Sequence, residues 1–78
     1  MSRTVRIGII GSGGIARAHV RAYRTMANVE IAAVADVVPG KARQFIDDMG
    51  LDGAQAFEGH RRLLELELDG VSVCTPNM

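Results

Sequence analysis

The sequence predicts an α/β fold of the doubly wound kind, with the element sequence βαβαβαβ and a parallel four-stranded sheet in the order 3-2-1-4. Short apolar runs alternate with segments of helical periodicity, as in parallel sheets with right-handed crossovers. The first run is apolar nearly throughout and rich in β-branched residues, as in a strand buried on both faces. Several glycines then join this run to the first helical segment, at the turn that lies beside the switch point of such sheets.

The first half of the chain is expected to form a strand, a helix and a second strand. Residues 5–10, VRIGII, make the first strand, and residues 30–35, EIAAVA, make the second, which ends at Asp36. Residues 15–26 between them are expected to be helical. The apolar face of this helix is predicted by three- and four-residue spacing at Ile15, His19, Ala22, Tyr23 and Met26.

A second helix is expected within VVPGKARQFIDDMG. Pro39 suits the first turn of a helix, and Gly50 suits a left-handed residue that ends one. The spacing i, i+3, i+4, i+7 predicts its buried stripe at Ala42, Phe45, Ile46 and Met49. Met49, like Met26, is therefore expected to fill the core.

The last third of the chain carries shorter elements. Residues 54–57, AQAF, predict a short strand, and residues 59–68 predict a short helix. An Asp-Gly turn signal then precedes the last strand, VSVC, at residues 71–74. The leucines expected to face inward from the helix are Leu63, Leu64 and Leu68.

Length and composition limit the class of protein. Seventy-eight residues make one domain, and nine Lys and Arg side chains balance nine Asp and Glu, so nucleic acid and anionic membranes are disfavoured as partners. The longest apolar run is too short to span a membrane, and the N-terminus has no apolar signal region. The single cysteine, Cys74, suits a reducing compartment, and no Cys and His cluster offers a metal site. We therefore expect a cytoplasmic protein without a metal.

A small core predicts self-association. A chain of this length buries roughly 60 to 65% of its unfolded surface, and a lone cysteine allows no internal disulfide. Small scaffolds commonly add a partner subunit instead. In the predicted strand order, VSVC forms an exposed apolar edge that invites pairing. We expect a homodimer or a higher assembly through this edge or through uncovered helix faces.

Residues 11–16, GSGGIA, match the pattern G-x-G-x-x-A at the junction of a strand and a helix. Gly11 permits a tight turn with a positive φ, Gly13 lets a pyrophosphate approach the backbone, and Ala16 lets the helix lie close to the strand. Gly14 adds a bare N–H at the helix start, where free amides and the helix dipole favour an anion. The alternative interpretation is a tight turn that binds no ligand.

Asp36 follows the second strand, ~20 residues after the glycine pattern, where the dinucleotide fingerprint places an acidic residue. Its carboxylate is expected to meet the adenosine ribose hydroxyls. An acidic residue at this place favours NAD, because it repels a 2′-phosphate, whereas Lys41 and Arg43 soften this preference and leave NADP open. The alternative is that Asp36 is an N-cap of the next helix or a solvated turn residue.

Three separated blocks resemble, in order and spacing, the N-terminal part of the glucose–fructose oxidoreductase / inositol dehydrogenase (Gfo/Idh/MocA) family. They are VRIGIIGSGGIARAHVRAY, VEIAAVADVVPGKARQF and DGVSVCTPN, and they cover nearly the whole chain. The resemblance implies the first half of a Rossmann domain that binds NAD or NADP, with residues 75–77 passing under the cofactor towards the nicotinamide. The expected cofactor-binding residues are Gly11, Ser12, Gly13, Gly14, Ile15, Ala16, Asp36, Thr75, Pro76 and Asn77.

Other motifs of the family have no matching positions in this sequence. Family members carry a Lys in a Glu-Lys-Pro motif, a downstream His or Asp for proton transfer, and a second α/β domain that holds the substrate. We therefore assign no catalytic residue. Residues 1–78 are expected to form one truncated dinucleotide-binding subdomain that lacks the catalytic and substrate domain, whether natural or designed.

Several charged or nucleophilic residues are assigned structural roles. Arg17, Arg21 and Arg24 predict a solvated face of the first helix, with contact between Arg17 and a phosphate as the alternative. His60 is expected to be solvated at the start of the third helix. Cys74 is expected to be a small core residue and not a nucleophile, because no base or cation lies near it in the sequence.

Two functions from different classes remain. The first is an NAD(P)-binding module of a Gfo/Idh/MocA-type oxidoreductase, which binds the adenosine–pyrophosphate part of the cofactor and does not turn over substrate alone. The second is a structural or designed half-Rossmann fragment that folds and self-associates without nucleotide. A fragment of an S-adenosylmethionine methyltransferase is a third possibility, which the G-x-G-x-x-A spacing and the CTPN block disfavour.

Overall fold

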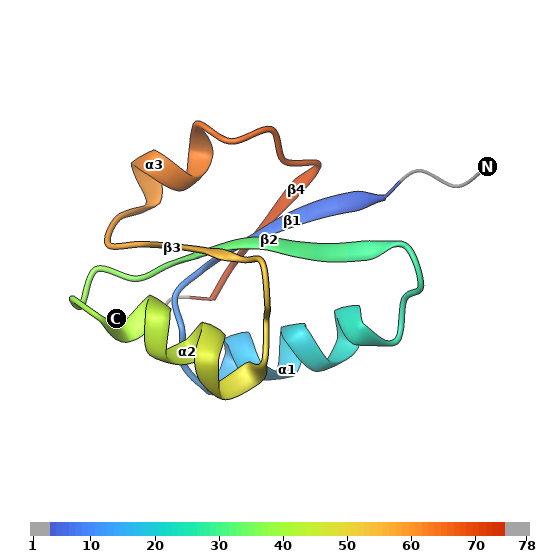
Figure 1. The fold of residues 1–78 in the computed structure, drawn as a ribbon, viewed down its shortest axis with the longest axis horizontal. Helices are drawn as coiled ribbons and strands as arrows, with labels where there is room; N and C mark the ends of the chain where they lie inside the picture. The colour runs from blue at the N-terminus through green and yellow to red at the C-terminus, as the bar shows by residue number, and fades with distance from the viewer. Residues whose placement is uncertain (1–3, 75–78) are drawn as a thin grey trace.

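The computed structural model describes residues 4–74 and contains one four-stranded sheet (Figure 1). The strand order is β3-β2-β1-β4, and every neighbouring pair is parallel, which confirms the predicted fold class. The elements in chain order are β1 (Val5–Ile10), α1 (Gly14–Arg24), β2 (Val29–Ala35), α2 (Lys41–Met49), β3 (Gln55–Phe57), α3 (His60–Leu64) and β4 (Gly70–Val73).

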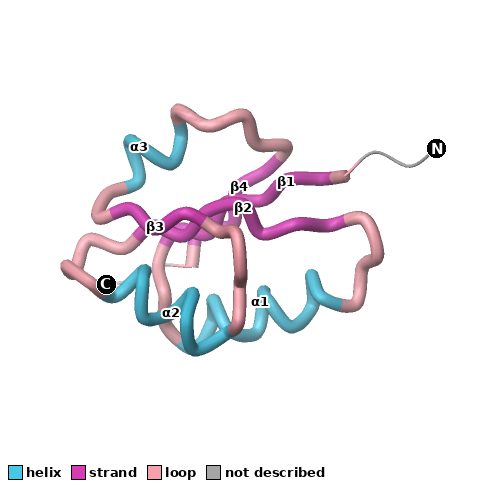
Figure 2. Tube along the Cα trace, viewed as in Figure 1, coloured by secondary structure: helices cyan, strands magenta, loops and turns pink. Residues whose placement is uncertain are grey.

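The helices cover the two faces of the sheet unequally. Helices α1 and α2 lie on one face, and α3 lies on the other (Figures 1 and 2). The chain first moves outward from β1 to β3 and then returns to place β4 on the other side of β1. Because right-handed crossovers in opposite directions place their helices on opposite faces, this reversal makes the junction of β1 and β4 the switch point of the sheet.

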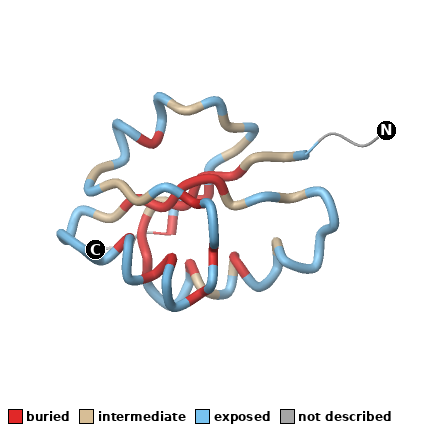
Figure 3. The backbone as a smooth tube through the Cα atoms, in the orientation of Figure 1, coloured by how far each residue is buried: buried red, intermediate tan, exposed pale blue. Residues whose placement is uncertain are grey.

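Buried residues follow the middle of the sheet and the inner sides of the helices (Figure 3). The smaller apolar cluster, beneath α3, is centred on Leu63, Ala33 and Ala35. The larger cluster lies on the side of α1 and α2. Its buried members are Ile7, Ile9, Ala16, Val20, Val34, Ala42, Phe45, Ile46, Met49, Leu51, Ala54 and Cys74.

A glycine within β1 allows α3 to approach the sheet closely. The β1–β2 register shifts between Ile7 and Gly8. A Cβ at Gly8 would lie 2.8 Å from side-chain carbons of both Leu63 and Leu68. Gly8 therefore leaves the space that these two leucines fill, a packing role that the sequence analysis did not assign.

The predicted second helix is confirmed in its buried face and in its end. Its predicted stripe at Ala42, Phe45, Ile46 and Met49 is buried. Gly50 ends the helix with a φ of 65°, in the left-handed region that glycine adopts without steric cost. Its start was predicted wrongly, because Pro39 lies in the turn before α2, which begins at Lys41 after Gly40.

The predicted face of the first helix is wrong for most of its members. Ile15 and Met26 are 57% and 48% exposed, and Ala22 is also exposed. Ala16 and Val20 are completely buried instead. The small Ala16 brings the helix close to the sheet and sets its rotation, so the larger apolar residues at other positions turn outward.

The third helix is shorter than predicted, and only part of its leucine pattern is buried. Leu63 is fully buried, Leu68 is half-buried and Leu64 is 55% exposed. A five-residue helix contacts the sheet through about one turn, so adjacent leucines cannot both face inward. In the described part of the chain, no helix has the length and apolar character that a bilayer crossing needs.

Candidate functional site

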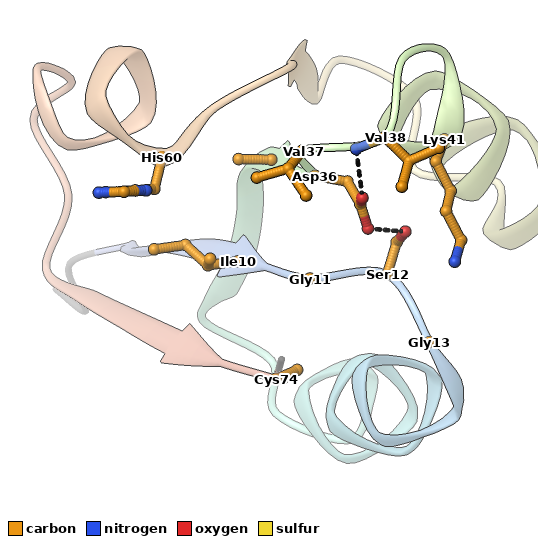
Figure 4. A pocket seen from close by; sticks show the side chains of 11 residues that line it. Ile10, Gly11, Ser12, Gly13, Asp36, Val37, Val38, Lys41, His60 and Cys74 are labelled. Carbon is orange, nitrogen blue, oxygen red and sulfur yellow. Dashed lines mark hydrogen bonds between the residues drawn. The ribbon is translucent and has the colours of Figure 1, made fainter. Parts of the chain in front are cut away.

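A pocket of about 350 Å³ opens where the carboxyl ends of the central strands meet (Figure 4). Backbone hydrogen bonds hold these ends in register. The N–H of Gly11 donates to the carbonyl of Ala35 at 2.8 Å, and the N–H of Cys74 donates to the carbonyl of Ile10 at 2.7 Å. The pocket thus lies at the switch point, where doubly wound sheets hold their ligands.

The glycine turn forms one wall of this pocket through Gly11, Ser12 and Gly13. Gly11 has a φ of 94°, which confirms that its backbone requires glycine. Gly13 has a φ of −95° and ψ of −161°, which any residue adopts, and a Cβ built there meets nothing within 4 Å. Since neither the backbone conformation nor packing explains the glycine at position 13, its bare backbone is free for close contact with a ligand.

The start of α1 presents amides without a capping side chain. Gly13 is the N-cap of this eleven-residue helix, no side chain caps it, and its first turn contains no acidic residue. The first N–H groups of a helix have no partner within the helix, and the dipole makes this end electropositive. A phosphate group would satisfy both requirements, so the residues at this wall fit an anionic ligand.

Asp36, at the end of β2, forms the polar part of the opposite wall (Figure 4). Its Oδ2 accepts a hydrogen bond from Ser12 Oγ at 2.6 Å, and its Oδ1 accepts one from the N–H of Val38 at 2.9 Å. The alternative role as a turn residue is therefore partly correct, because Asp36 does hold the turn after β2. It does not cap α2, whose N-cap is Gly40.

The surroundings of Asp36 favour its charged form. Partial burial raises its pKa, but the hydrogen bonds from Ser12 and Val38 and the positive charge of Lys41 together outweigh burial. The pKa of Asp36 consequently lies below its ordinary value. The pocket therefore holds a carboxylate at neutral pH, suited to accepting hydrogen bonds from a diol and to repelling a second anion near it.

The rest of the pocket is largely apolar. Val37 is 78% exposed and Val38 51% exposed, and both line the pocket together with Ile10. Large apolar side chains left exposed beside a polar site are typical of surfaces that contact a flat organic group. The sequence analysis missed this wall, although two valines directly after the strand-ending Asp36 were a usable signal.

His60 and Cys74 also line the pocket. His60 is exposed at the start of α3, as predicted, but its place in the pocket wall was not foreseen. Cys74 is buried, and burial raises the pKa of its thiol. This supports the prediction of a packing residue, because a reactive cysteine requires a lowered pKa.

The remaining predicted site residues are distributed around the turn. Gly14 begins α1, Ile15 is exposed beside it, and Ala16 is fully buried where the helix meets the sheet. None of the three lines the pocket itself. Thr75, Pro76 and Asn77 lie outside the described residues. Among residues 4–74, no group of three or more His, Cys, Asp and Glu side chains is arranged to hold a metal ion.

The arginines of α1 depart from a simple solvated face. Arg21 is exposed, as predicted. Arg17 is half-buried on α2, 3.6 Å from the carboxylate of Asp48 and 5.8 Å from the centroid of the Phe45 ring. Arg24 donates a hydrogen bond to the carbonyl of Met49. The predicted solvated face is therefore wrong for Arg17, whereas Arg24 is exposed as predicted, and both arginines connect α1 to α2.

A glycine turn at a helix start, an acidic residue after the second strand and a pocket at the switch point define a dinucleotide-binding domain of the Rossmann type. The family model described as "Oxidoreductase family, NAD-binding Rossmann fold" matches residues 5–78. The chain belongs to this Gfo/Idh/MocA oxidoreductase family, as the resemblance implied, and its match lies in the NAD-binding Rossmann fold of the family.

Two relatives illustrate the match in sequence. An inositol 2-dehydrogenase/D-chiro-inositol 3-dehydrogenase of Lactiplantibacillus plantarum is 39% identical over 77 residues, which are 97% of this chain and 22% of that protein. A glucose-6-phosphate 3-dehydrogenase of Bacillus subtilis is 39% identical over 72 residues, which are 92% and 19% of the two chains. The chain thus spans about a fifth of the length of these relatives.

Solved structures show the same fold with either cofactor. The myo-inositol dehydrogenase of Lactobacillus casei, solved with NAD(H) and myo-inositol, matches with a TM-score of 0.81 and 30% identity over 92% of this chain and 22% of that one. A variant of a 3-ketoreductase from Actinomadura kijaniata, solved with TDP-benzene and NADP, matches with a TM-score of 0.81 and 29% identity over 95% and 23%.

Proposed function

We propose that this chain binds the adenosine–pyrophosphate part of NAD or NADP and does not transfer hydride by itself. The observation that carries the proposal is the bare, uncapped start of α1 beside the Asp36 carboxylate in one pocket. The turn at 11–16 would hold the pyrophosphate, and Asp36 would accept hydrogen bonds from the ribose. The adenine would lie against the exposed Val37 and Val38. A bound cofactor supplies the nicotinamide ring that carries the hydride.

We assign cofactor binding, and no step of turnover, to the described residues. Hydride transfer needs a proton donor or acceptor and a substrate pocket positioned beside the nicotinamide. The family's residues for these tasks have no matching positions in this sequence. Of the two histidines, His19 is half-buried on α1 with its ring packed edge-on against Tyr23, and His60 is on the proposed adenine side. We therefore propose a cofactor-binding role for residues 4–74 and assign no proton-transferring residue among them.

The proposed preference is for NAD over NADP. The Asp36 carboxylate is ionised at neutral pH and would repel a 2′-phosphate placed next to it. Lys41 lines the same pocket and reduces this repulsion, so NADP is expected to bind more weakly and not to be excluded. Relatives of this fold solved with NAD(H) and with NADP are compatible with either outcome.

Isothermal titration with NAD, NADP and ADP-ribose tests the proposal. Saturable binding of ADP-ribose with nearly the affinity of NAD would support recognition of the adenosine–pyrophosphate part. Absence of saturable heat with all three would overturn the proposal and leave the structural fragment that binds no nucleotide. Binding of S-adenosylhomocysteine in preference to ADP-ribose would instead favour the methyltransferase alternative.

We also propose that copies of this chain associate through the outer edge of β4. The N–H of Cys74 points to Ile10 of β1, so alternation along the strand directs the backbone groups of Val71 and Val73 away from the sheet. The side chains of these valines are 37% and 67% exposed. An apolar edge with outward backbone groups favours pairing with another strand. A monomeric mass in light scattering across the micromolar range would contradict this association.

A further inference from the structure

Ser12 connects the two walls of the pocket. It lies between Gly11 and Gly13 in the glycine turn, yet its side chain reaches Asp36, which is 24 residues away in the sequence. The Oγ–Oδ2 distance is 2.6 Å, and Ser12 is only 7% exposed. A short bond to a charged acceptor, held in a buried position, fixes both side chains relative to each other.

A second pocket of about 210 Å³ adjoins the first at Ser12. It shares Ser12 and Lys41 with the first pocket, and Arg17, Gln44 and Asp48 are among its other lining residues. Arg17 is within 3.6 Å of Asp48, which balances one of the two cations. The second pocket therefore offers two cations, Lys41 and Arg17. Arg17 can leave Asp48 to bind a phosphate monoester, and both side chains are suited to such a group.

The orientation of the Asp36 carboxylate depends on donors from both walls of the pocket, and the backbone N–H of Ser12 is one of them. Val38 N–H holds Oδ1, and Ser12 Oγ holds Oδ2. Each carboxylate oxygen accepts more than one hydrogen bond, so both remain able to accept from ribose hydroxyls. The N–H of Val38 belongs to the same turn as Asp36, whereas Ser12 belongs to the opposite wall. The hydroxyl and the backbone N–H of Ser12 therefore hold the carboxylate relative to the glycine turn, and the hydroxyl has the larger effect on the pKa of Asp36.

We propose that Ser12 is a positioning residue that sets the choice between NAD and NADP. Its hydroxyl holds the Asp36 carboxylate in the first pocket, beside the Ser12 and Lys41 that both pockets share, where the carboxylate accepts a ribose 2′-hydroxyl and keeps a 2′-phosphate away from Lys41 and Arg17. This inference rests on the proposed cofactor binding. It adds a role for a serine whose place in the glycine pattern allows any residue type.

Replacing Ser12 tests the proposal through the ratio of two affinities. In Ser12→Ala, Asp36 loses the hydroxyl donor of the glycine turn and keeps the weaker backbone N–H, so NAD binding should weaken by up to about tenfold, the loss expected for one hydrogen bond to a charged group. NADP should lose less, because its phosphate gains access to the second pocket, so the NADP-to-NAD affinity ratio should rise severalfold, with about tenfold as the upper limit. Ser12→Thr keeps the hydroxyl and should keep the wild-type ratio. Circular dichroism melting of both variants confirms folding.

Two further measurements separate positioning from a local change in the turn. In an Asp36→Ala background, Ser12→Ala should leave the ratio unchanged, because Ser12 acts through Asp36. An NMR pH titration of the Asp36 side-chain carboxyl, in the chain without ligand, should show a higher pKa in Ser12→Ala than in wild type. Ser12→Thr should show the wild-type pKa.

The outcomes distinguish this inference from the proposed function. If wild type binds NAD and Ser12→Ala lowers NAD and NADP affinity equally, the positioning role is overturned and cofactor binding stands. If wild type binds neither cofactor, the proposed function fails and so does the selection role. An unchanged Asp36 pKa in Ser12→Ala overturns the inference without reference to any ligand.

Discussion

Replacing Gly13 separates the folding of the glycine turn from its proposed contact with phosphate. The backbone of Gly13 is extended, and an added Cβ would meet nothing within 4 Å. Alanine is a poorer N-cap than glycine, but it also lowers the entropy of the unfolded chain, and these effects nearly cancel. Gly13→Ala should therefore change the free energy of unfolding by no more than about 0.5 kcal/mol.

The effect of the same replacement on cofactor binding should be large. The added methyl group would stand where a pyrophosphate oxygen approaches the backbone amides of the turn. Loss of one hydrogen bond to a charged group costs about 1.5–3 kcal/mol, which raises the Kd for ADP-ribose by roughly tenfold to a hundredfold. Gly13→Val, with a larger side chain, should lower binding further while the extended backbone tolerates it.

Titration calorimetry and urea unfolding of the same samples measure both effects. Gly59→Ala is the matched control, because Gly59 is also an extended N-cap glycine whose Cβ would meet open space. It should leave ADP-ribose binding within about twofold of wild type. Equal Kd values for wild type and Gly13→Ala would refute the reasoning. A loss of binding accompanied by unfolding would show that Gly13 is required by the fold and not by the ligand.

Three further predictions concern packing and charge. Gly8→Ala should lower the free energy of unfolding by about 1–3 kcal/mol in urea, because its Cβ would lie 2.8 Å from Leu63 and Leu68 side-chain carbons; a neutral result would show that both leucines move freely. Leu63→Ala should lower the free energy of unfolding by about 2–5 kcal/mol, whereas Leu64→Ala, at a 55% exposed position, should lower it by less than about 1 kcal/mol. Equal losses would contradict the assigned orientation of α3. Because the pKa of Asp36 is depressed in the folded chain, its stabilising contribution should be fully present above its unfolded pKa and disappear as the pH falls through the lower folded value. Asp36→Asn should therefore be less stable than wild type at neutral pH, with the difference shrinking in acid; a constant difference in pH-dependent melting would contradict it.

The sequence predicted the parts of this molecule that depend on local spacing. The strand at 5–10, the buried stripe of α2 and the positive φ of Gly11 are each determined within about one helical turn or one strand. The predicted face of α1 failed, because its rotation depends on how Ala16 fits against the sheet. Packing between distant segments, and not periodicity, decides which of several apolar stripes is buried.

The candidate site also divides into features that depend on a short segment and features that depend on the assembled fold. The glycine turn and Asp36 each have a signature in a short segment, so both were identified. The hydrogen bond that joins Ser12 to Asp36 and the placement of His60 opposite Val37 depend on the strand order, which brings three chain segments to one edge of the sheet. A pattern of glycines predicts a candidate ligand site, but the polar contacts proposed to select between ligands arise only from the assembled fold.

Gly8, Gly11 and Gly13 lie close together in the sequence, but the reason why each position lacks a side chain differs. Gly8 leaves room for two leucines of the chain itself, and Gly11 adopts a φ that side chains rarely tolerate. Gly13 meets neither condition, since its φ is ordinary and its missing Cβ would face open space. Gly13, at an uncapped helix start, is therefore the one of the three whose missing side chain favours the proposed contact with a phosphate.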